Sequence, residues 1–175
     1  ISAYEELPPQ AFRESGAYTG WVTSLWREGR LEDAKQQANR WLELAQAEGN
    51  AEQESWAQHV LMRVAEEEGR PEAALAHGLE MLRLAPDSDA HMHLVRILRG
   101  MGRYAEAKGH LEAYLTHGSN PILREEAERV LPEVARLAAE QAGMLRATPT
   151  ASGDTFVNSD EGASPQGAQN GGTNP

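Results

Sequence analysis

Apolar residues recur at every third or fourth position along most of the chain, with polar residues between them. This spacing is typical of amphipathic helices and differs from the strict alternation expected of strands. The apolar positions of the three clearest stretches are Tyr18, Trp21, Val22 and Leu25, then Trp56, Val60, Leu61, Val64 and Ala65, then Leu94, Ile97, Leu98 and Met101. The pattern therefore predicts a chain built of helices.

A six-residue phrase, Gly-Arg-apolar-x-x-Ala, follows each of these stretches, at residues 29–34, 69–74 and 102–107. The alanines of successive copies are 40 and 33 residues apart. A period of this size indicates stacked helical hairpins, each too small to bury its own apolar face. We expect each glycine to end a helix with a positive φ, and Pro71 to begin the next helix.

The alanine of each phrase is expected where the second helix of a hairpin crosses the first, since a small side chain permits close approach. A large residue follows seven positions later in every copy, and these residues are Trp41, Met81 and Tyr114. Seven residues are almost two helical turns, so the alanine and the large residue should share one buried face.

These residues resemble the tetratricopeptide repeat over roughly positions 17–118. The middle copy carries Leu61, Gly69, Ala74 and Pro86 at the positions of that pattern, and the third carries Leu94, Gly102, Tyr104 and Ala107. The copies depart from it where Trp21 replaces the leucine, and where Val22, Met62 and Val95 replace a small residue. The resemblance implies an all-α fold, a right-handed α-solenoid of helical hairpins with degenerate repeats.

The expected organisation has three parts. Residues 1–8 are predicted to be an N-terminal linker, and a first helix is expected to begin near Pro9. The helical repeat domain should span 9–146, with repeats at about 17–50, 55–86 and 88–120 and a capping helix at 121–146. Pro132 lies inside this last stretch, where a proline costs ~3 kcal/mol, so we expect a kink or a new helix there.

Residues 147–175 are rich in Gly, Ser, Asn, Thr and Pro and contain no Lys or Arg. Such a composition predicts a disordered tail, because little apolar surface is available to offset the ordering entropy. The tail is expected to be a spacer. Alternatively, its Asp-Thr-Phe-Val segment, residues 154–157, is a short docking motif or folds back into the protein's own groove.

In the tetratricopeptide family the first helices of successive hairpins line a concave groove, which implies a set of partner-binding positions here. With the register set by Trp21, Leu61 and Leu94, these positions are Thr19, Thr23, Trp26, Trp56, His59, Arg63, Met92, Arg96 and Arg99. Aromatic anchors beside arginines suit a peptide that bears carboxylates, including a free C-terminus. The alternative is that Glu66, Glu67 or Asp89 neutralise these arginines.

The family's carboxylate clamp for chaperone tails requires Lys and Asn at set groove positions. Those positions are held here by Thr19, Thr23, Val60, Asp89 and His93, so a heat-shock co-chaperone role is not supported.

Charge and composition narrow the function classes. The net charge of −11 argues against nucleic-acid binding, and no stretch of eighteen apolar residues predicts a membrane span. The chain has no cysteine, which fits a cytoplasmic or a periplasmic protein. Because it begins with Ile1, we expect a processed product or a piece of a larger protein.

The sequence contains no phosphate-binding loop, nucleophile elbow or dinucleotide motif. His91 and His93 lie two residues apart on an expected helix and should point in different directions, so no metal site and no cofactor are expected. We therefore expect a protein that is not an enzyme: an adaptor or scaffold that binds a protein or peptide, such as an assembly factor of a bacterial complex. The alternatives are an oligomerisation module, whose repeats stack end to end or pair through exposed Trp21, Trp26 or Trp41, and a regulatory domain cut from a larger protein.

Overall fold

The protein is helical throughout the part that the structure describes. This structure is a computed structural model, and it describes residues 15–86 and 88–147. The helices are α1 (Ser15–Arg27), α2 (Leu31–Glu48), α3 (Ala51–Glu67), α4 (Pro71–Leu84), α5 (Ala90–Gly100), α6 (Tyr104–His117) and α7 (Pro121–Ala147). No strand occurs within these two ranges, so the prediction of an all-α protein is confirmed.

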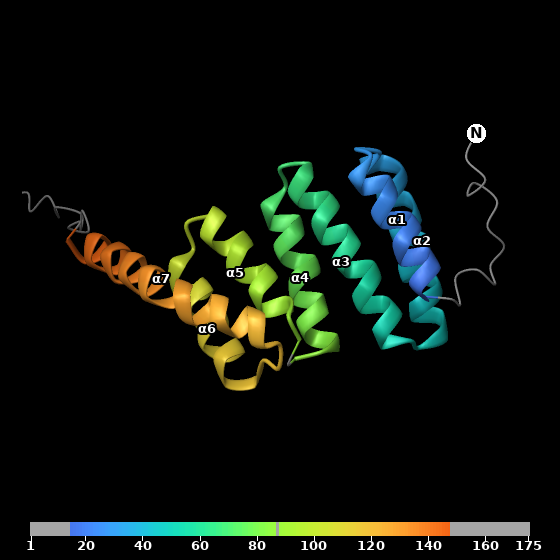
Figure 1. Cartoon of the computed structure of the whole chain (residues 1–175). Coiled ribbons are helices and arrows are strands. Elements are labelled where there is room, and N and C mark those ends of the chain that lie inside the picture. Colours follow the sequence, from blue (N-terminus) through green and yellow to red (C-terminus); the bar gives the residue numbers. More distant parts are fainter. Residues whose placement is uncertain (1–14, 87, 148–175) are drawn as a thin grey trace, which may run out of the picture.

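Each helix packs mainly against the next helix in the chain, and α1 also contacts α3 while α5 contacts α7. Figure 1 shows the result: the helices follow one another across the molecule, with α1 and α2 at one end and α7 at the other. Three pairs, α1–α2, α3–α4 and α5–α6, are joined through the three Gly-Arg turns. Residues close in sequence therefore supply most of the packing.

The Gly-Arg turns have the backbone geometry that the sequence predicts. Gly29, Gly69 and Gly102 adopt φ values of 75°, 68° and 71°, which a residue with a Cβ rarely tolerates. The arginine N–H after each glycine donates back into the preceding helix; for Arg70 the acceptor is the carbonyl of Ala65, at 2.8 Å. Pro71 occupies the first turn of α4, as expected.

The alanines of the three phrases lie in the core. Ala34, Ala74 and Ala107 are completely buried, and so are Trp41 and Tyr114 seven residues beyond the first and third of them. The polar ends of the two large side chains have partners: Trp41 Nε1 donates to Gln53 Oε1 at 3.5 Å, and the Tyr114 hydroxyl donates to Asp89 Oδ1 at 2.7 Å. The predicted sharing of one buried face is confirmed.

Two groups of buried residues make up the core. One surrounds Trp41 and joins α1, α2 and α3, and the other surrounds Leu94 and extends from α3 to α7. In the second group, Gly78 of α4 faces Leu94 so closely that a Cβ at residue 78 would lie 2.6 Å from Leu94 Cδ2. The absence of a side chain at Gly78 thus permits α4 to approach α5.

The tryptophans differ from two expectations. Trp41 is not exposed but fully buried, and Trp21 and Trp26 are partly buried against the same core group, so pairing through an exposed Trp41 is wrong. The reason is that α2 turns Trp41 toward both α1 and α3. Trp56, placed by its spacing among the core positions of α3, is instead 44% exposed.

The prediction that a new helix begins at Pro132 is wrong, because α7 continues without a break from Pro121 to Ala147. Pro132 cannot donate to the carbonyl of Glu128, but both residues are exposed and water can satisfy that carbonyl. On either side of the proline, Ala127 and Val134 are fully buried and hold the helix against the body.

The apolar residues of α7 are only partly covered. Ile122 and Leu145, near the two ends of the helix, are 76% and 73% exposed. Between these ends, α7 packs on α6 and α5, and Gln141 Nε2 donates to the carbonyl of Gly102 at 3.1 Å. The helix thus caps the α5–α6 pair along its middle.

Two predictions lie outside the described residues: the linker at 1–8 with a helix starting near Pro9, and the disorder of the tail after Ala147. Within the ranges that are described, none of the helices combines the length and apolar character required of a membrane span.

Replacing Ala74 by leucine tests the close crossing within the α3–α4 pair. Ala74 is fully buried whereas Ala76, two residues later in α4, is exposed. We expect Ala74→Leu to lower the free energy of unfolding by about 1–3 kcal/mol through overpacking, and Ala76→Leu to change it by less than about 0.5 kcal/mol. Urea unfolding followed by circular dichroism measures both, and equal effects would contradict a tight crossing at Ala74.

Candidate functional site

One side of the molecule carries a set of polar and aromatic side chains from the first helix of each pair. We call it the arginine–histidine face, and it consists of Trp26 on α1, Trp56, His59, Arg63 and Glu66 on α3, and His93, Arg96 and Arg99 on α5. The helices present these residues together because their opposite sides are held in the core by the apolar positions described above.

The centre of this face is a carboxylate shared by two arginines. Glu66 Oε2 accepts from Arg63 Nη1 at 3.2 Å on the same helix, and from Arg96 Nη2 at 2.8 Å on α5. Arg63 also lies over the ring of Trp26, with 4.8 Å between its guanidinium carbon and the ring centroid. This chain of contacts connects α1, α3 and α5. Two arginines and one glutamate leave it with a net positive charge.

Two histidines lie beside these charges. The ring centroids of His59 and His93 are 4.9 Å apart, and the ring of Trp56 meets His59 edge-on at 5.9 Å. Burial, then the charges of His93 and Arg63, lower the pKa of His59 to about 4. Burial, followed by the charges of Arg96 and Arg63, also lowers the pKa of His93. Both rings are therefore neutral at pH 7.

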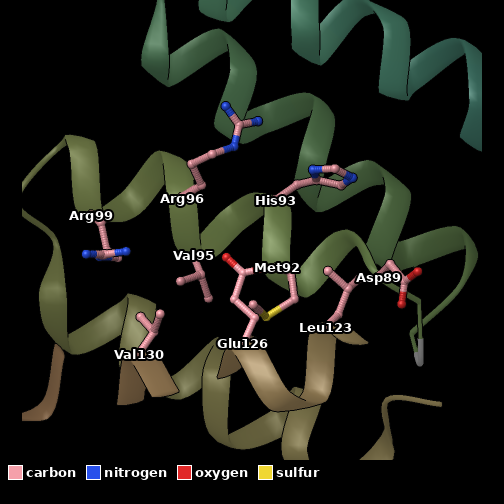
Figure 2. A pocket seen from close by; sticks show the side chains of 9 residues that line it. All are labelled: Asp89, Met92, His93, Val95, Arg96, Arg99, Leu123, Glu126 and Val130. Carbon is pink, nitrogen blue, oxygen red and sulfur yellow. The ribbon is translucent and has the colours of Figure 1, made fainter. Parts of the chain in front are cut away.

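A pocket of about 290 Å³ lies where the face meets α7 (Figure 2). Its apolar lining comes from Met92 and Val95 on α5 and from Leu123 and Val130 on α7. The polar residues around it are Asp89, His93, Arg96, Arg99 and Glu126. Arg99 Nη2 donates to Glu133 Oε2 at 3.5 Å, which ties α5 to α7 at one end of the pocket.

The structure brings most of the predicted groove residues together. Trp26, Trp56, His59, Arg63 and Arg96 belong to the connected contacts of the face, and Met92, Arg96 and Arg99 line the pocket. Thr23 is partly buried on α1, and the side chain of Thr19 lies outside the part that is described.

The acidic residues considered as neutralising partners behave differently from one another. Glu66 does pair with Arg63 and Arg96, and it connects two helices rather than merely cancelling a charge. Asp89 instead accepts from the Tyr114 hydroxyl and, at 3.4 Å, from Asn120 Nδ2. Sequence reasoning missed the contribution of α7 to the pocket. This helix was predicted to cap the array, and a capping helix must contact the preceding pair. Its contact with α5 could therefore have been inferred from the sequence.

His91 and His93 point to different neighbours, as their spacing predicts. His91 Nδ1 lies 3.0 Å from Nδ1 of His110 on α6, whereas His93 faces His59 on α3. Among the residues that the structure describes, no three His, Asp, Glu or Cys side chains come together as metal ligands would.

No protein-family model matches the chain, and comparison with curated proteins finds no similar sequence.

The partly buried His59 makes stability depend on pH. His59 has a pKa of about 4 in the folded protein and its ordinary pKa of 6.5 in the unfolded chain. Between these two pH values the unfolded chain binds a proton that the folded protein does not, so protonation favours unfolding. The stability of the fold with a neutral His59 is fully present above pH 6.5, and it decreases as the pH falls toward 4. Between pH 7 and pH 4, we expect His59→Gln to lose about 2–3 kcal/mol less unfolding free energy than the wild type.

Chemical unfolding at a series of pH values measures this difference. His117→Gln, which removes an exposed histidine at the end of α6, is the matched control. Parallel pH profiles for the wild type and His59→Gln would show that His59 is not desolvated as described.

Proposed function

We propose that this protein is a non-catalytic adaptor that binds a segment of a protein partner along the arginine–histidine face. The observation that carries the proposal is the connected line of side chains from Trp26 through Arg63 and Glu66 to Arg96, which spans three helices. An extended surface of this kind suits a peptide segment better than a small molecule. Chains with this resemblance to tetratricopeptide repeats include bacterial assembly factors, and we propose a role of that class.

The proposal includes the finer architecture, a short right-handed α-solenoid of tetratricopeptide-like hairpins. Three features support it: the positive-φ glycine turn repeated in each pair, the buried alanine after each turn, and packing between neighbours in the chain. In such an array the first helices of successive pairs share one side, and here these helices are α1, α3 and α5.

The preferred partner carries carboxylates. The protein has a net charge of −11, yet Arg63, Arg96 and Arg99 are grouped on one face. A guanidinium group has five N–H donors, and the contact with Glu66 uses a single nitrogen of Arg63 and of Arg96. Donors therefore remain for the side-chain or terminal carboxylates of a peptide. Trp56, which is 44% exposed, offers apolar contact beside them.

Binding is favoured over acid–base catalysis by the state of the histidines. A general base works best when its pKa lies near the operating pH, and the pKa of His59 is about 4. The ring is thus a weak base at pH 7. Its contacts with Trp56 and His93 make it part of a packed surface.

The double variant Arg96→Glu, Arg99→Glu tests the site. A library of peptides with free C-termini is selected on the wild-type protein, and the affinity of selected peptides is measured by fluorescence anisotropy. We expect peptides rich in carboxylates, with a Kd that rises about tenfold or more in the double variant, equivalent to ~1.4 kcal/mol. We also expect the Kd to rise with salt concentration.

The matched control is Arg83→Glu, Arg136→Glu, which reverses two exposed and ion-paired arginines on α4 and α7 that do not belong to the arginine–histidine face. It should leave the Kd within about twofold of the wild type. Equal losses in the two double variants, or selection of peptides without acidic groups, would reject the arginine–histidine face as the site.

A further inference from the structure

The pocket between α5 and α7 has the dimensions and chemistry to receive side chains of a peptide segment. Its volume of about 290 Å³ lies at the lower end of ligand pockets, near roughly 300 Å³, so it suits one or two large side chains. Met92, Val95, Leu123 and Val130 line it, and Arg99 stands at the end where Val130 lies (Figure 2). An occupant should therefore be apolar with an acidic group beside it.

The chain itself contains a segment of that composition beyond α7. Phe156 and Val157 are the only large apolar residues between Thr148 and Pro175. Acidic residues flank them, with Asp154 before and Asp160 and Glu161 after, and the segment has no Lys or Arg. Its charge of −3 is opposite to that of Arg96 and Arg99, which line the pocket together with the acidic Asp89 and Glu126.

The length of chain after α7 matches the distance to the pocket. Seventeen residues separate Val130 from Ala147, which is about 26 Å along a helix. Nine residues separate Ala147 from Phe156, and an extended chain of that length spans about 30 Å. Phe156 is therefore among the first residues that can return to the level of Val130.

The order of charges along this path also fits. A chain that returns along α7 from Ala147 passes Glu133 and its partner Arg99 before it reaches Val130. Asp154 precedes Phe156 by two residues and would lie beside Arg99 when Phe156 enters the pocket. Glu126 lies between the Val130 and Leu123 ends of the pocket, and Asp89 lies near the Leu123 end, where it already accepts hydrogen bonds from Tyr114 and Asn120 (Figure 2).

We propose that Phe156 and Val157 occupy the α5–α7 pocket of their own chain, with Asp154 beside Arg99. The bound segment covers the Arg96–Arg99 end of the arginine–histidine face. As a consequence that rests on the proposed function, it competes with a partner for this end. The docking itself does not depend on that function.

The methionine methyl groups of the full chain report on the occupant. The chain has five methionines, and Met92 lines the pocket, whereas Met62 is buried on α3. In the spectrum of ¹³C-methyl-labelled protein, with Met92 assigned through Met92→Leu, we expect Phe156→Ala to shift the Met92 resonance. The Met62 resonance should stay in place, because the aromatic ring current acts only nearby.

A variant of the same composition tests whether the tail needs the length from Ala147 to residue 156 to bring a phenylalanine to the pocket. Ala151→Phe combined with Phe156→Ala keeps one phenylalanine in the tail but places it four residues from Ala147, about 13 Å in an extended chain. We expect its Met92 resonance to match that of Phe156→Ala. Because the chain lacks cysteine, Thr155→Cys gives a single site for a spin label, which should broaden the Met92 signal away until the label is reduced.

Three outcomes would overturn the proposal. They are an unchanged Met92 resonance in Phe156→Ala, a wild-type Met92 resonance in the matched variant, and a Met92 shift that disappears on dilution. The last would assign the pocket to the tail of a second copy. An unmoved Met62 resonance and circular dichroism establish that each variant is folded. Failure of the proposed function is distinguishable, because the Met92 result requires no partner peptide.

Discussion

The rest of the structure depends on the close crossing of two helices at a buried alanine. Ala34, Ala74 and Ala107 have no exposed surface, so each methyl group is completely covered by the residues packed around it. The turn before each crossing requires a residue with positive φ, and glycine supplies it. Large side chains such as Trp41 and Tyr114 then fill the space that opens away from the crossing. Each helix pair buries one face within itself and must bury the other against the next pair.

This packing decides where polar groups can gather. Since α1, α3 and α5 hold their apolar sides in the core, their remaining sides lie together, and residues some thirty positions apart in sequence become neighbours. Glu66 and Arg96 meet at 2.8 Å and His59 and His93 at a centroid separation of 4.9 Å for this reason. The pocket forms where the series of pairs gives way to the single helix α7, which follows the α5–α6 pair without a partner of its own in the described chain.

Features fixed by local sterics were predictable from the sequence, and features fixed by helix placement were not. The turns at Gly29, Gly69 and Gly102 and the burial of the alanines follow from backbone geometry and periodicity, and the structure has both. The groove positions on α3 and α5 were predicted from a repeat register, and His93, which holds one of the clamp positions in that register, faces His59, a contact that the register alone did not predict. The burial of Trp41, predicted from its spacing to Ala34, is also observed, and only the alternative that exposes it is wrong. The continuity of α7 at Pro132 was not predicted, because it depends on packing at Ala127 and Val134.

The neutral histidines limit the positive charge that gathers beside the arginines. Charged rings at His59 and His93 would add two positive charges beside Arg63 and Arg96, with Glu66 as the carboxylate that bridges those arginines. Burial prevents this by favouring the uncharged form of both rings, so the face keeps a modest positive charge instead of a large self-repelling one. A carboxylate brought by a binding segment would relieve the remaining repulsion between the arginines. It would also favour proton uptake by the histidines, so occupancy of the face and its protonation are coupled by the same few charges.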